Sequence, residues 1–344
     1  MKQFDFRIDI LRNGIKVGQA FAESVRIHYD YNADVMKGMQ FSLIKTKMAS
    51  AELQFDMFKD RLRPVLISAG KETPLGVFMI VAAPVRYTDV VDTTEIEAYD
   101  ETMIVKQAAF ETRQYFASGT RYIDIIQSIL TSLGFANIRT DASTAALSTA
   151  LEAAVGENCL EFINNLLDAM NYQHLHADAA GDIQIRKAVN PTEAQFKYSD
   201  SQNFALINEI RRDTDIYDLP NVVVGVYSSA DKSNPVVYKK VNDDPNSLIS
   251  TVNRGYKVVK KVNVRNGATL ADLTAYVDRI AFEAMQTTET VEFTTIAEGG
   301  HEPNTAVQLD TSDVRGLFVE KSWTISIGQN QLSMTHAAER KVFV

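Results

Sequence analysis

Two histidines separated by one residue are the first candidates for chemistry in this sequence. His174 and His176 lie in the segment YQHLHADAAGDIQIRKA, which has the apolar alternation of a strand, a turn and a returning strand. On a strand they would share one face, and that spacing suits a metal. Zinc needs a third protein ligand, however, and the sequence offers no convincing one. We therefore predict that both histidines are structural or surface residues.

Other metal-type residues give weaker signals. His301-Glu302 begins HEPNT, which has no second histidine four residues later and contains a proline that opposes a helix, so we expect a loop rather than a metalloprotease motif. Asp213, Asp215 and Asp218 offer oxygen ligands for calcium, but this run lacks the glycine and the distant glutamate of a calcium-binding loop. We expect a solvated loop there.

The single cysteine, Cys159, excludes an intramolecular disulfide and a cysteine-clustered zinc site. It falls on or beside the apolar face of an expected helix, which favours a buried and inert thiol over a nucleophile. Carboxylates are abundant, but no spacing selects a catalytic pair. The sequence has no phosphate-cradling glycine loop and no G-x-S-x-G elbow. We therefore predict no enzyme activity and assign no catalytic, cofactor-binding or metal-binding residue.

A modest group of cations lies on expected strands of the C-terminal half, namely Lys239, Lys240, Lys257, Lys260 and Lys261. They are interpreted either as a solvated sheet edge or as a contact with an acidic partner or another subunit.

Composition narrows the class of protein. The chain has 344 residues, of which 45% are apolar, and its formal charge is 35 − 44 = −9. Two or three packed units are expected at this length. No window approaches the roughly 18 apolar residues of a membrane span, and the N-terminus has no signal-peptide pattern, so we expect no membrane insertion. The acidic balance argues against general nucleic-acid affinity, although a passage through which nucleic acid slides would tolerate it.

Residues 1–110 are expected to form antiparallel strands. In FDFRIDILRNG, Phe4, Phe6, Ile8 and Ile10 alternate with charged residues, and the following Asn13-Gly14 is a strong hairpin signal. Further strands are predicted at VRIHYDY, MQFSLIK, RPVLISAG, GVFMIVAAPV and EIEAYD. Many short antiparallel strands are typical of a barrel or a sandwich.

Residues 111–188 change to a helical period. Thr120 is predicted to cap the helix RYIDIIQSILTSLG, and Asn158 with Glu161 makes a capping-box-like pair at the start of a second helix, before the hairpin with the two histidines. This region is predicted to be a small α+β insert.

Residues 189–344 return to strands and contain one helix, LADLTAYVDRIAFEAMQ, with Thr269 and Asp272 as its predicted cap. The predicted fold class is thus α+β and mainly β. The order of a β unit, an insert and a second β unit suggests two related units that have diverged.

The order and spacing of these segments resemble phage tail hub proteins. The resemblance rests on the Asn13-Gly14 hairpin, the helix YIDIIQSILTSLG, the stretch ENCLEFINNLLDAMNYQHLHADAAGDIQIRK, the helix LADLTAYVDRIAFEAMQ and the closing VQLDTSDVRGLFVEKSWTISIG. It spans nearly the whole chain and covers both the baseplate hubs of contractile tails and the N-terminal modules of tail-associated lysins.

This resemblance implies an architecture and a role. Each subunit would present two tube-like antiparallel β-barrels, from residues 1–110 and 189–344, with the α+β domain of residues 111–188 inserted between them. Three subunits would form a pseudo-six-fold ring that adapts the hexameric tail tube to the tip and lets DNA pass. The implied partners are two further copies, a distal tail or tube protein, the tape-measure protein and a tip spike or fibre. The implied location is the virion tail tip, after synthesis in the host cytoplasm.

Two other functions compete with a non-enzymatic hub. Tail-associated lysins continue into a hydrolase, whereas this sequence ends at KVFV, so we expect no lytic activity. A carbohydrate-binding or glycan-cleaving tail-tip protein is the alternative, suggested by the carboxylates and by Tyr227, Tyr238 and Tyr256. A weaker alternative is the base of a secretion-system spike.

Overall fold

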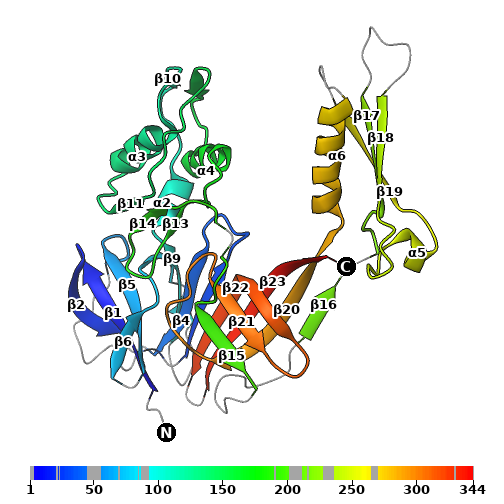
Figure 1. Cartoon of the computed structure of the whole chain (residues 1–344). Coiled ribbons are helices and arrows are strands. Elements are labelled where there is room, and N and C mark those ends of the chain that lie inside the picture. Colours follow the sequence, from blue (N-terminus) through cyan, green and yellow to red (C-terminus); the bar gives the residue numbers. More distant parts are fainter. Residues whose placement is uncertain are drawn as a thin grey trace. The chain divides into compact units, whose positions relative to one another are not determined.

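The structure of the protein is a computed structural model (Figure 1). It describes residues 4–20, 22, 24–44, 56–68, 70–83, 85–86, 93–189, 191–200, 211–214, 217–227, 236–264, 270–328 and 331–343. The chain divides into two compact units, which are described separately. Unit 1 comprises residues 1–209 and 293–337, and unit 2 comprises residues 210–292 and 338–344.

The N-terminal part of unit 1 is a run of strands, in agreement with the predicted β region. These strands are β1 (Phe4–Arg12), β2 (Ile15–Ala20), β3 (Ser24–Asp30), β4 (Lys37–Ile44), β5 (Asp60–Ser68), β6 (Lys71–Pro74), β7 (Phe78–Ala82), β8 (Val85–Arg86) and β9 (Thr93–Asp100). Strands β1 and β2 form the predicted hairpin, and its turn residues have the positive φ that a tight turn requires: 52° at Asn13 and 76° at Gly14.

The alternation in β1 buries Ile8 and Ile10 as predicted, but it also buries a charge. Asp9 is 0% exposed, because three long cationic side chains cover it. Its carboxylate lies 2.7 Å from Lys16 Nζ, 3.0 Å from Arg7 Nε and 3.1 Å from Arg63 Nη2. Burial alone would raise the pKa of Asp9, but hydrogen bonds from these three cations lower it to about 2.

The C-terminal strands join the same sheet as the N-terminal strands. They are β15 (Phe196–Ser199), β20 (Gln286–Ile296), β21 (Ala306–Asp310), β22 (Arg315–Gly328) and β23 (Gln331–Phe343). Strand β22 pairs antiparallel with β3, from Ser322 opposite Asp30 to Ile327 opposite Val25.

The resulting strand order is β20-β23-β22-β3-β4-β9-β7-β5-β1-β2, and β21 adds to β22. The prediction of a mainly β, largely antiparallel fold is confirmed. In the described strands this order does not close on itself, so the two separate closed barrels implied by the resemblance are not seen. Instead, the pairing of β22 with β3 joins the two β regions in one sheet.

One face of this sheet forms the main core of unit 1. Residues from β1, β3, β4, β5, β7, β9, β22 and β23 meet there, and Ile27, Met39, Phe78 and Ile325 are almost completely buried. Trp323 packs against Tyr29 with 5.8 Å between ring centroids. Aliphatic and aromatic residues at alternate positions of many strands supply the apolar area that stabilises this unit.

The segment between β9 and β15 has its own apolar core. Its elements are α2 (Thr102–Gln107), β10 (Gln114–Phe116), α3 (Tyr122–Ser132), β11 (Ile138–Thr140), β12 (Leu151–Ala153), α4 (Cys159–Ala169), β13 (His176–Ala177) and β14 (Ile183–Ile185). Below, we call residues 102–188 the insert. Strands β13 and β14 pair antiparallel as predicted, and β11 adds to β14 in parallel.

Of the two helix N-caps that the sequence predicts in the insert, one is confirmed. Asn158 accepts hydrogen bonds from the backbone N–H groups of Leu160 and Glu161, at 3.0 and 3.1 Å, and so caps α4 as predicted. The prediction for Thr120 is wrong, because α3 begins one residue later, with Arg121 at the N-cap and no side-chain cap.

Unit 2 is built around a three-stranded sheet and one long helix. Its elements are β16 (Arg211–Thr214), β17 (Val222–Tyr227), β18 (Val236–Val241), α5 (Thr251–Arg254), β19 (Val259–Val264) and α6 (Leu270–Ala284). In the sheet, β17 lies between β18 and β19. Figure 1 shows α6 along one face of these strands. The predicted cap residue Thr269 lies outside the described residues, and of Asp272 only the backbone is described.

None of the helices in the described part of the chain has the length and apolar character to cross a bilayer.

The ion pairs of Asp9 lead to a pH-dependent prediction. We expect Asp9→Asn to lower the free energy of unfolding at pH 7 by about 2 kcal/mol, because a neutral amide cannot balance three cations. A carboxyl whose folded pKa lies below its unfolded value stabilises the fold above the unfolded pKa, so the contribution is lost as the pH falls from about 4 to about 2. Urea unfolding at several pH values measures both effects.

Asp5→Asn is the matched control, because Asp5 lies on the same strand and is exposed. The account of Asp9 is wrong if both variants lose the same stability at pH 7.

Candidate functional site

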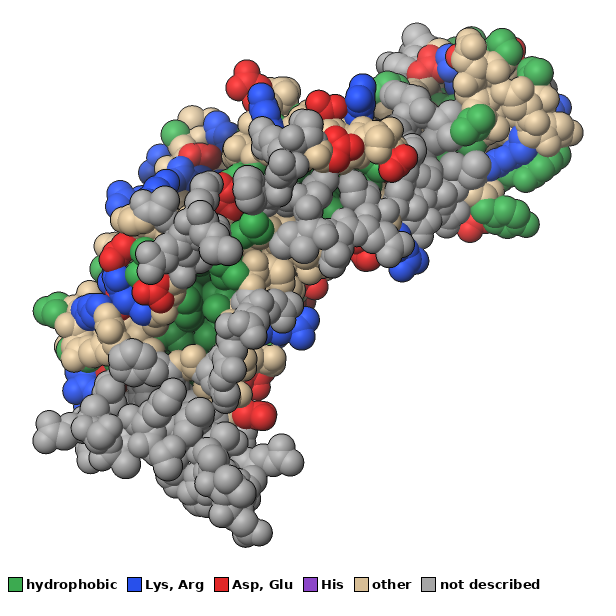
Figure 2. All heavy atoms as spheres, turned by 90° about the horizontal axis from the view of Figure 1, so that it is seen from below, with side chains coloured by type: hydrophobic (Ala, Val, Ile, Leu, Met, Phe, Trp, Pro, Cys, Tyr) green, Lys and Arg blue, Asp and Glu red, His purple; other side chains and the backbone are tan. Residues whose placement is uncertain are grey.

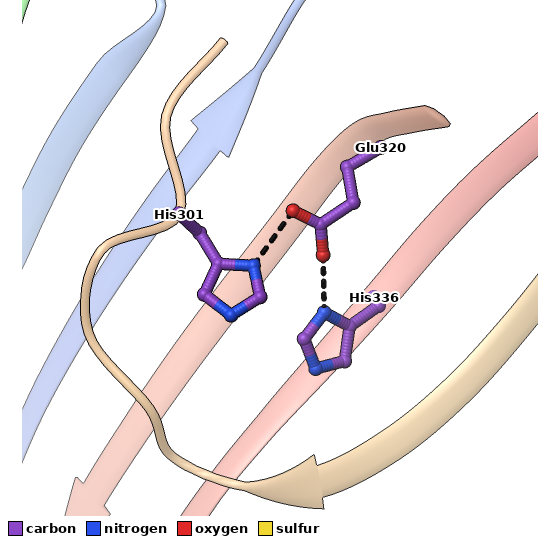
Figure 3. Close-up of side chains that lie close together, drawn as sticks. All are labelled: His301, Glu320 and His336. Atoms are coloured by element: carbon purple, nitrogen blue, oxygen red, sulfur yellow. Dashed lines mark hydrogen bonds and ion pairs between the residues drawn. The ribbon is translucent and has the colours of Figure 1, made fainter. Parts of the chain in front are cut away.

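Three ionisable side chains meet in the interior of unit 1. His301 lies in the loop between β20 and β21, Glu320 on β22 and His336 on β23, and all three are buried. Figure 3 shows the Glu320 carboxylate between the two imidazole rings. Glu320 Oε2 lies 2.7 Å from His301 Nδ1, and Glu320 Oε1 lies 2.6 Å from His336 Nδ1. We call these three residues the His–Glu–His cluster.

Aromatic rings fix the orientation of both imidazoles. Phe196 stacks on His301 with 3.8 Å between ring centroids and an interplanar angle of 12°. Phe293 stacks on His336 at 4.5 Å and 9°. Because the rings cannot rotate without losing these contacts, their Nδ1 atoms stay directed at Glu320.

The hydrogen-bond partners determine where the protons lie. A carboxylate oxygen only accepts, so each Nδ1 carries the proton and donates it to Glu320. The Nε2 atoms are then placed to accept from two hydroxyls, Tyr198 at 3.2 Å from His301 and Thr295 at 2.8 Å from His336, and the Thr295 hydroxyl shares its proton with the carbonyl of Ile296 at 3.1 Å. Two neutral histidines and one ionised glutamate therefore satisfy every nitrogen and carboxylate oxygen of the cluster.

The pKa directions agree with this proton arrangement. Burial lowers the pKa of His336, which favours the neutral ring. Burial alone would raise the pKa of Glu320, but the hydrogen bonds from the two histidines hold it below its ordinary value. Burial also raises the pKa of Tyr198, which keeps this hydroxyl protonated and able to donate.

The cluster has the right residue types for a divalent metal, and its ligand atoms all lie within 4.8 Å of one another. Tetrahedral zinc, however, separates its nitrogen and oxygen ligands by roughly 3.3 Å, given metal–ligand bonds of about 2.0–2.2 Å. The observed separations of 2.6 and 2.7 Å are hydrogen-bond lengths. The geometry thus fits shared protons better than a metal ion.

The cluster is also closed to substrates. The cavity beside His301, lined in part by Leu75 and Trp323, has a volume of about 10 Å³. This is about the space that one water molecule needs. We interpret the cluster as a structural network that joins the loop of His301 to β22 and β23.

Sequence reasoning missed this cluster because its members are separated by 19 and 16 positions. The prediction of a loop at His301 was right, but a loop can still be buried. One signal was available: Met334, His336 and Ala338 alternate along β23 and are all 0% exposed, which places His336 on an inward face.

The neighbouring Glu302 connects three parts of unit 1. Its Oε2 lies 2.6 Å from Nζ of Lys37, a lysine at the start of β4 that is only 2% exposed. Its Oε1 accepts a hydrogen bond of 2.8 Å from the backbone N–H of Ala179, in the turn of the β13–β14 hairpin. One carboxylate thereby ties the insert and the 301–305 loop to the N-terminal β region.

The same hairpin turn approaches the N-terminal β region through Gly181. Its φ is +91°, and a Cβ built there would lie 2.9 Å from the Val77 side chain. The turn HADAAGD therefore needs glycine for its backbone conformation and for close packing. This explains in physical terms the Ala-Gly-Asp turn that contributed to the family resemblance.

The two histidines that opened the sequence analysis lie apart from the cluster. His174 is partly exposed, with Nε2 3.1 Å from Asp168 Oδ1. His176 is 5% exposed, and its Nδ1 lies 2.8 Å from the carbonyl of His174, so this nitrogen must donate. Burial lowers the pKa of His176 to about 4, so the ring is neutral at pH 7. Both side chains have structural partners within the insert.

The remaining candidates are dispersed. Cys159 is buried in the core of the insert, and burial raises its pKa, as expected of an inert thiol. For the calcium hypothesis, Asp213 lies on strand β16 rather than in the expected loop and is described only by its backbone, and Asp215 lies outside the described residues. For the glycan alternative, the Tyr238 hydroxyl donates to Asp278, Tyr256 lies beside Arg254, and the side chain of Tyr227 is not described.

A polar face is the second functional feature of unit 1. Opposite the core, strands β3, β4, β9 and β22 present hydroxyl, amide and charged groups in register. These residues are Ser24, Arg26, His28, Asp30, Gln40, Ser42, Glu95, Glu97, Tyr99, Ser322, Thr324 and Ser326. Two hollows of about 490 and 360 Å³ lie on this face.

The charges on this polar face are few and of both signs. Arg26 is its one permanent cation among the twelve residues named above. Burial lowers the pKa of His28, which keeps that ring neutral. Figure 2, which views the molecule from below, likewise shows cationic and anionic side chains interspersed among the described residues. A face of this kind has no cluster of cations with which to hold phosphates.

Comparisons with known proteins place this fold among tail proteins. The tail protein from Neisseria meningitidis MC58 is 11% identical and superposes with a TM-score of 0.64, over 97% of this chain and 96% of that chain. The 43 kDa tail protein of prophage MuSo2 from Shewanella oneidensis is 11% identical with a TM-score of 0.65, over 97% and 98% of the two chains.

The fold also occurs in secretion systems. The E. coli c3393 protein, a component of the type VI secretion system, is 8% identical with a TM-score of 0.52, over 96% of this chain and 76% of that chain. No protein-family model and no curated protein matches the sequence. The resemblance to phage tail hub proteins is therefore confirmed at the level of the fold, through structure rather than through sequence identity.

The close packing of Gly181 gives a test of how the insert is held. We expect Gly181→Ala to lower the free energy of unfolding by about 2 kcal/mol or more, because a methyl group adds a clash with Val77 to the strain of a positive φ. Gly119→Ala is the control, since Gly119 has φ +87° and open space at its Cβ position. Equal losses in chemical denaturation would show that the contact with Val77 contributes nothing.

The His–Glu–His cluster gives a second test. We expect Glu320→Gln to lower the free energy of unfolding by about 2 to 4 kcal/mol, because one amide cannot accept from both Nδ1–H groups. Glu298→Gln, at an exposed glutamate of the same unit, should change it by less than about 0.5 kcal/mol.

Metal removal separates the two interpretations of the cluster. If protons alone join the three residues, a strong chelator leaves the melting temperature of the unsubstituted protein unchanged. A fall in melting temperature on chelation, reversed by zinc, would contradict the hydrogen-bonded interpretation.

Proposed function

We propose that this protein is a structural subunit of a phage or prophage tail hub, located at the tail tip, where three copies form a pseudo-six-fold ring at the distal end of the tail tube. The observation that carries the proposal is the shared fold with two tail proteins over 96–98% of their chains and 97% of this one. A match of this extent includes both β regions and the insert between them.

The ring requires two tube units in each subunit. We assign these to residues 1–110 and 189–344, with residues 111–188 packed outside the tube or toward the tip. The pairing of β22 with β3 supports the assignment, because it lays strands of the two regions side by side in one sheet. Three such sheets give six units around the axis, with closure supplied by neighbouring copies rather than within one chain.

The polar face of unit 1 suits the lumen of that ring. A tube through which DNA slides should have no clustered cations on its inner surface, because each contact between a cation and a phosphate slows the passage of the DNA. Hydroxyl and amide groups, one arginine and a few carboxylates meet this requirement. The proposed partners are two further copies, a distal tail or tube protein, the tape-measure protein and a tip spike or fibre, with DNA only in transit. The subunit would be made in the host cytoplasm before assembly.

We infer a non-enzymatic role. The His–Glu–His cluster, the one group of three histidine, cysteine or carboxylate side chains close enough to share a ligand among the described residues, has its hydrogen bonds satisfied internally and a cavity of only about 10 Å³ beside it. A hydrolytic site would need room for a substrate next to its acid and base groups.

The base of a secretion-system spike is the second candidate. The match to the type VI component from E. coli favours it, because that protein shares the fold over nearly the whole of this chain. Both candidates place the protein beneath a spike, and they differ in the cargo that passes through the ring.

Ring formation is tested by imaging the full chain at raised local concentration. A trimeric coiled coil joined to the chain by a flexible linker compensates for the absence of neighbouring tail proteins, which the interface can depend on. Electron microscopy is expected to show rings with three-fold symmetry, six β units and an open centre.

Two further measurements complete this test. Single-chain images without rings, although the coiled coil is trimeric, would contradict the hub proposal. Binding of duplex DNA at low salt should be weak, and a strong, salt-dependent affinity would contradict the lumen assignment. Localisation with antibodies then separates a virion tail tip from a secretion-system spike.

A further inference from the structure

The central strand of unit 2 has the sequence of a strand that is buried on both faces. Strand β17 reads VVVGVY, an apolar run rather than an alternation, and it pairs in parallel with β19. Parallel pairs with continuous apolar sequences occur where both faces of a sheet are covered. The composition of β17 therefore predicts that other structure packs against each face of this strand.

Helix α6 supplies the layer on the first side. Leu273 and Val277 are fully buried with Val223 in one core, and Gly225 allows α6 to approach so closely that a Cβ there would lie 2.2 Å from Val277. At the edge of this contact, Asp278 accepts a hydrogen bond of 3.1 Å from the Tyr238 hydroxyl and lies 3.5 Å from Lys240 Nζ. An apolar stripe with a flanking carboxylate thus fits one face of the sheet.

The second face of the sheet is also apolar along β17, and side chains on its outer strands are exposed. Alternation places Val222, Val224 and Val226 there, opposite to Val223 and Gly225. In register, Val226 lies beside Val237, and Val222 lies beside Val259. Val237 is 53% exposed and Val259 is 57% exposed, whereas Val222 is only 1% exposed and is already covered within unit 2.

Two lysines flank the valines on this second face. Val224 is in register with Lys239 on β18 and with Lys261 on β19, and both lysines are exposed. The face is therefore a central row of valines with a cation on each side. We call it the valine–lysine face, defined by the accessible residues Val224, Val226, Val237, Lys239, Val259 and Lys261.

We propose that the valine–lysine face is a docking site for an amphipathic helix of a partner protein, with an apolar stripe over the valines and carboxylates directed at Lys239 and Lys261. The charge pattern argues for this occupant. Lysines on both sides of an apolar row favour a partner with acidic flanks, and they disfavour a purely apolar or basic one. Helix α6 gives the precedent on the first face, where an apolar stripe with a flanking carboxylate packs on the same strands.

The proposal does not depend on ring formation, because the face belongs to unit 2 and is defined by its own strands. It also assigns a role to two of the lysines on the strands of unit 2. Alternation directs Lys240 and Lys260 toward the side of α6 and leaves Lys239 and Lys261 on the valine–lysine face.

The test uses the full chain and a synthetic peptide of residues 270–286, LADLTAYVDRIAFEAMQ, which has the required apolar stripe and carboxylates. We expect fluorescence anisotropy to show saturable binding of the labelled peptide. The double variant Lys239→Glu with Lys261→Glu should weaken binding by about tenfold or more, and a peptide carrying Asp278→Lys should bind correspondingly less.

Lys260→Glu is the matched control, since Lys260 is exposed on the same strand and alternates to the other side. It should change the affinity by less than about twofold. Circular dichroism verifies that the double variant is folded.

Three results would overturn the proposal. The first is no binding at millimolar peptide concentration, and the second is equal weakening by Lys260→Glu and by the double variant. The third is self-association of the chain in sedimentation that the double variant abolishes, which would identify a second copy as the occupant. Absence of rings under the microscope would leave the docking result unaffected.

Discussion

The backbone pairing of β22 with β3 is the interaction on which the rest of unit 1 depends. It joins strands from opposite ends of the chain into one sheet, and this sheet creates two surfaces at once. On one side, Trp323 and Ile325 complete a core that begins with Val25 and Ile27. On the other side, the polar residues of four strands form a continuous face. A register slip of one residue would exchange these two sets and destroy both surfaces.

Two glutamates, the half-buried Glu302 and the buried Glu320, then fix how the loops and the insert sit on that sheet. Glu302 and Glu320 are each held by partners from separate segments, and each replaces the water that it loses with hydrogen bonds of 2.6–2.8 Å. Such contacts contribute little net stability but are costly to leave incomplete, so they favour a single arrangement. For the tail subunit that we propose, a defined arrangement of the loops is more useful than additional stability.

Local features of this fold could be predicted from the sequence, whereas contacts between residues far apart in the sequence could not. The Asn13-Gly14 hairpin, the cap at Asn158 and the strands of both β regions follow from turn chemistry, capping and alternation, all of which act over a few residues. The His–Glu–His cluster depends on the register of β22 against its neighbours, which no short pattern encodes. Asp9 shows the same limit, because an aspartate in an alternating strand indicates an exposed side chain until Lys16, Arg7 and Arg63 are seen to cover it.

The junction of β22 with β3 also constrains how the chain is made. Ser322 lies opposite Asp30, 292 positions earlier in the sequence. While the ribosome synthesises the residues between them, one edge of β3 has no strand to pair with. The core also stays open at the position that Trp323 fills later. Contacts of such sequence separation form slowly, and an unpaired edge can join other chains. Folding of unit 1 is therefore completed only after β22 has been synthesised, and until then this edge of β3 is open to pairing with other chains.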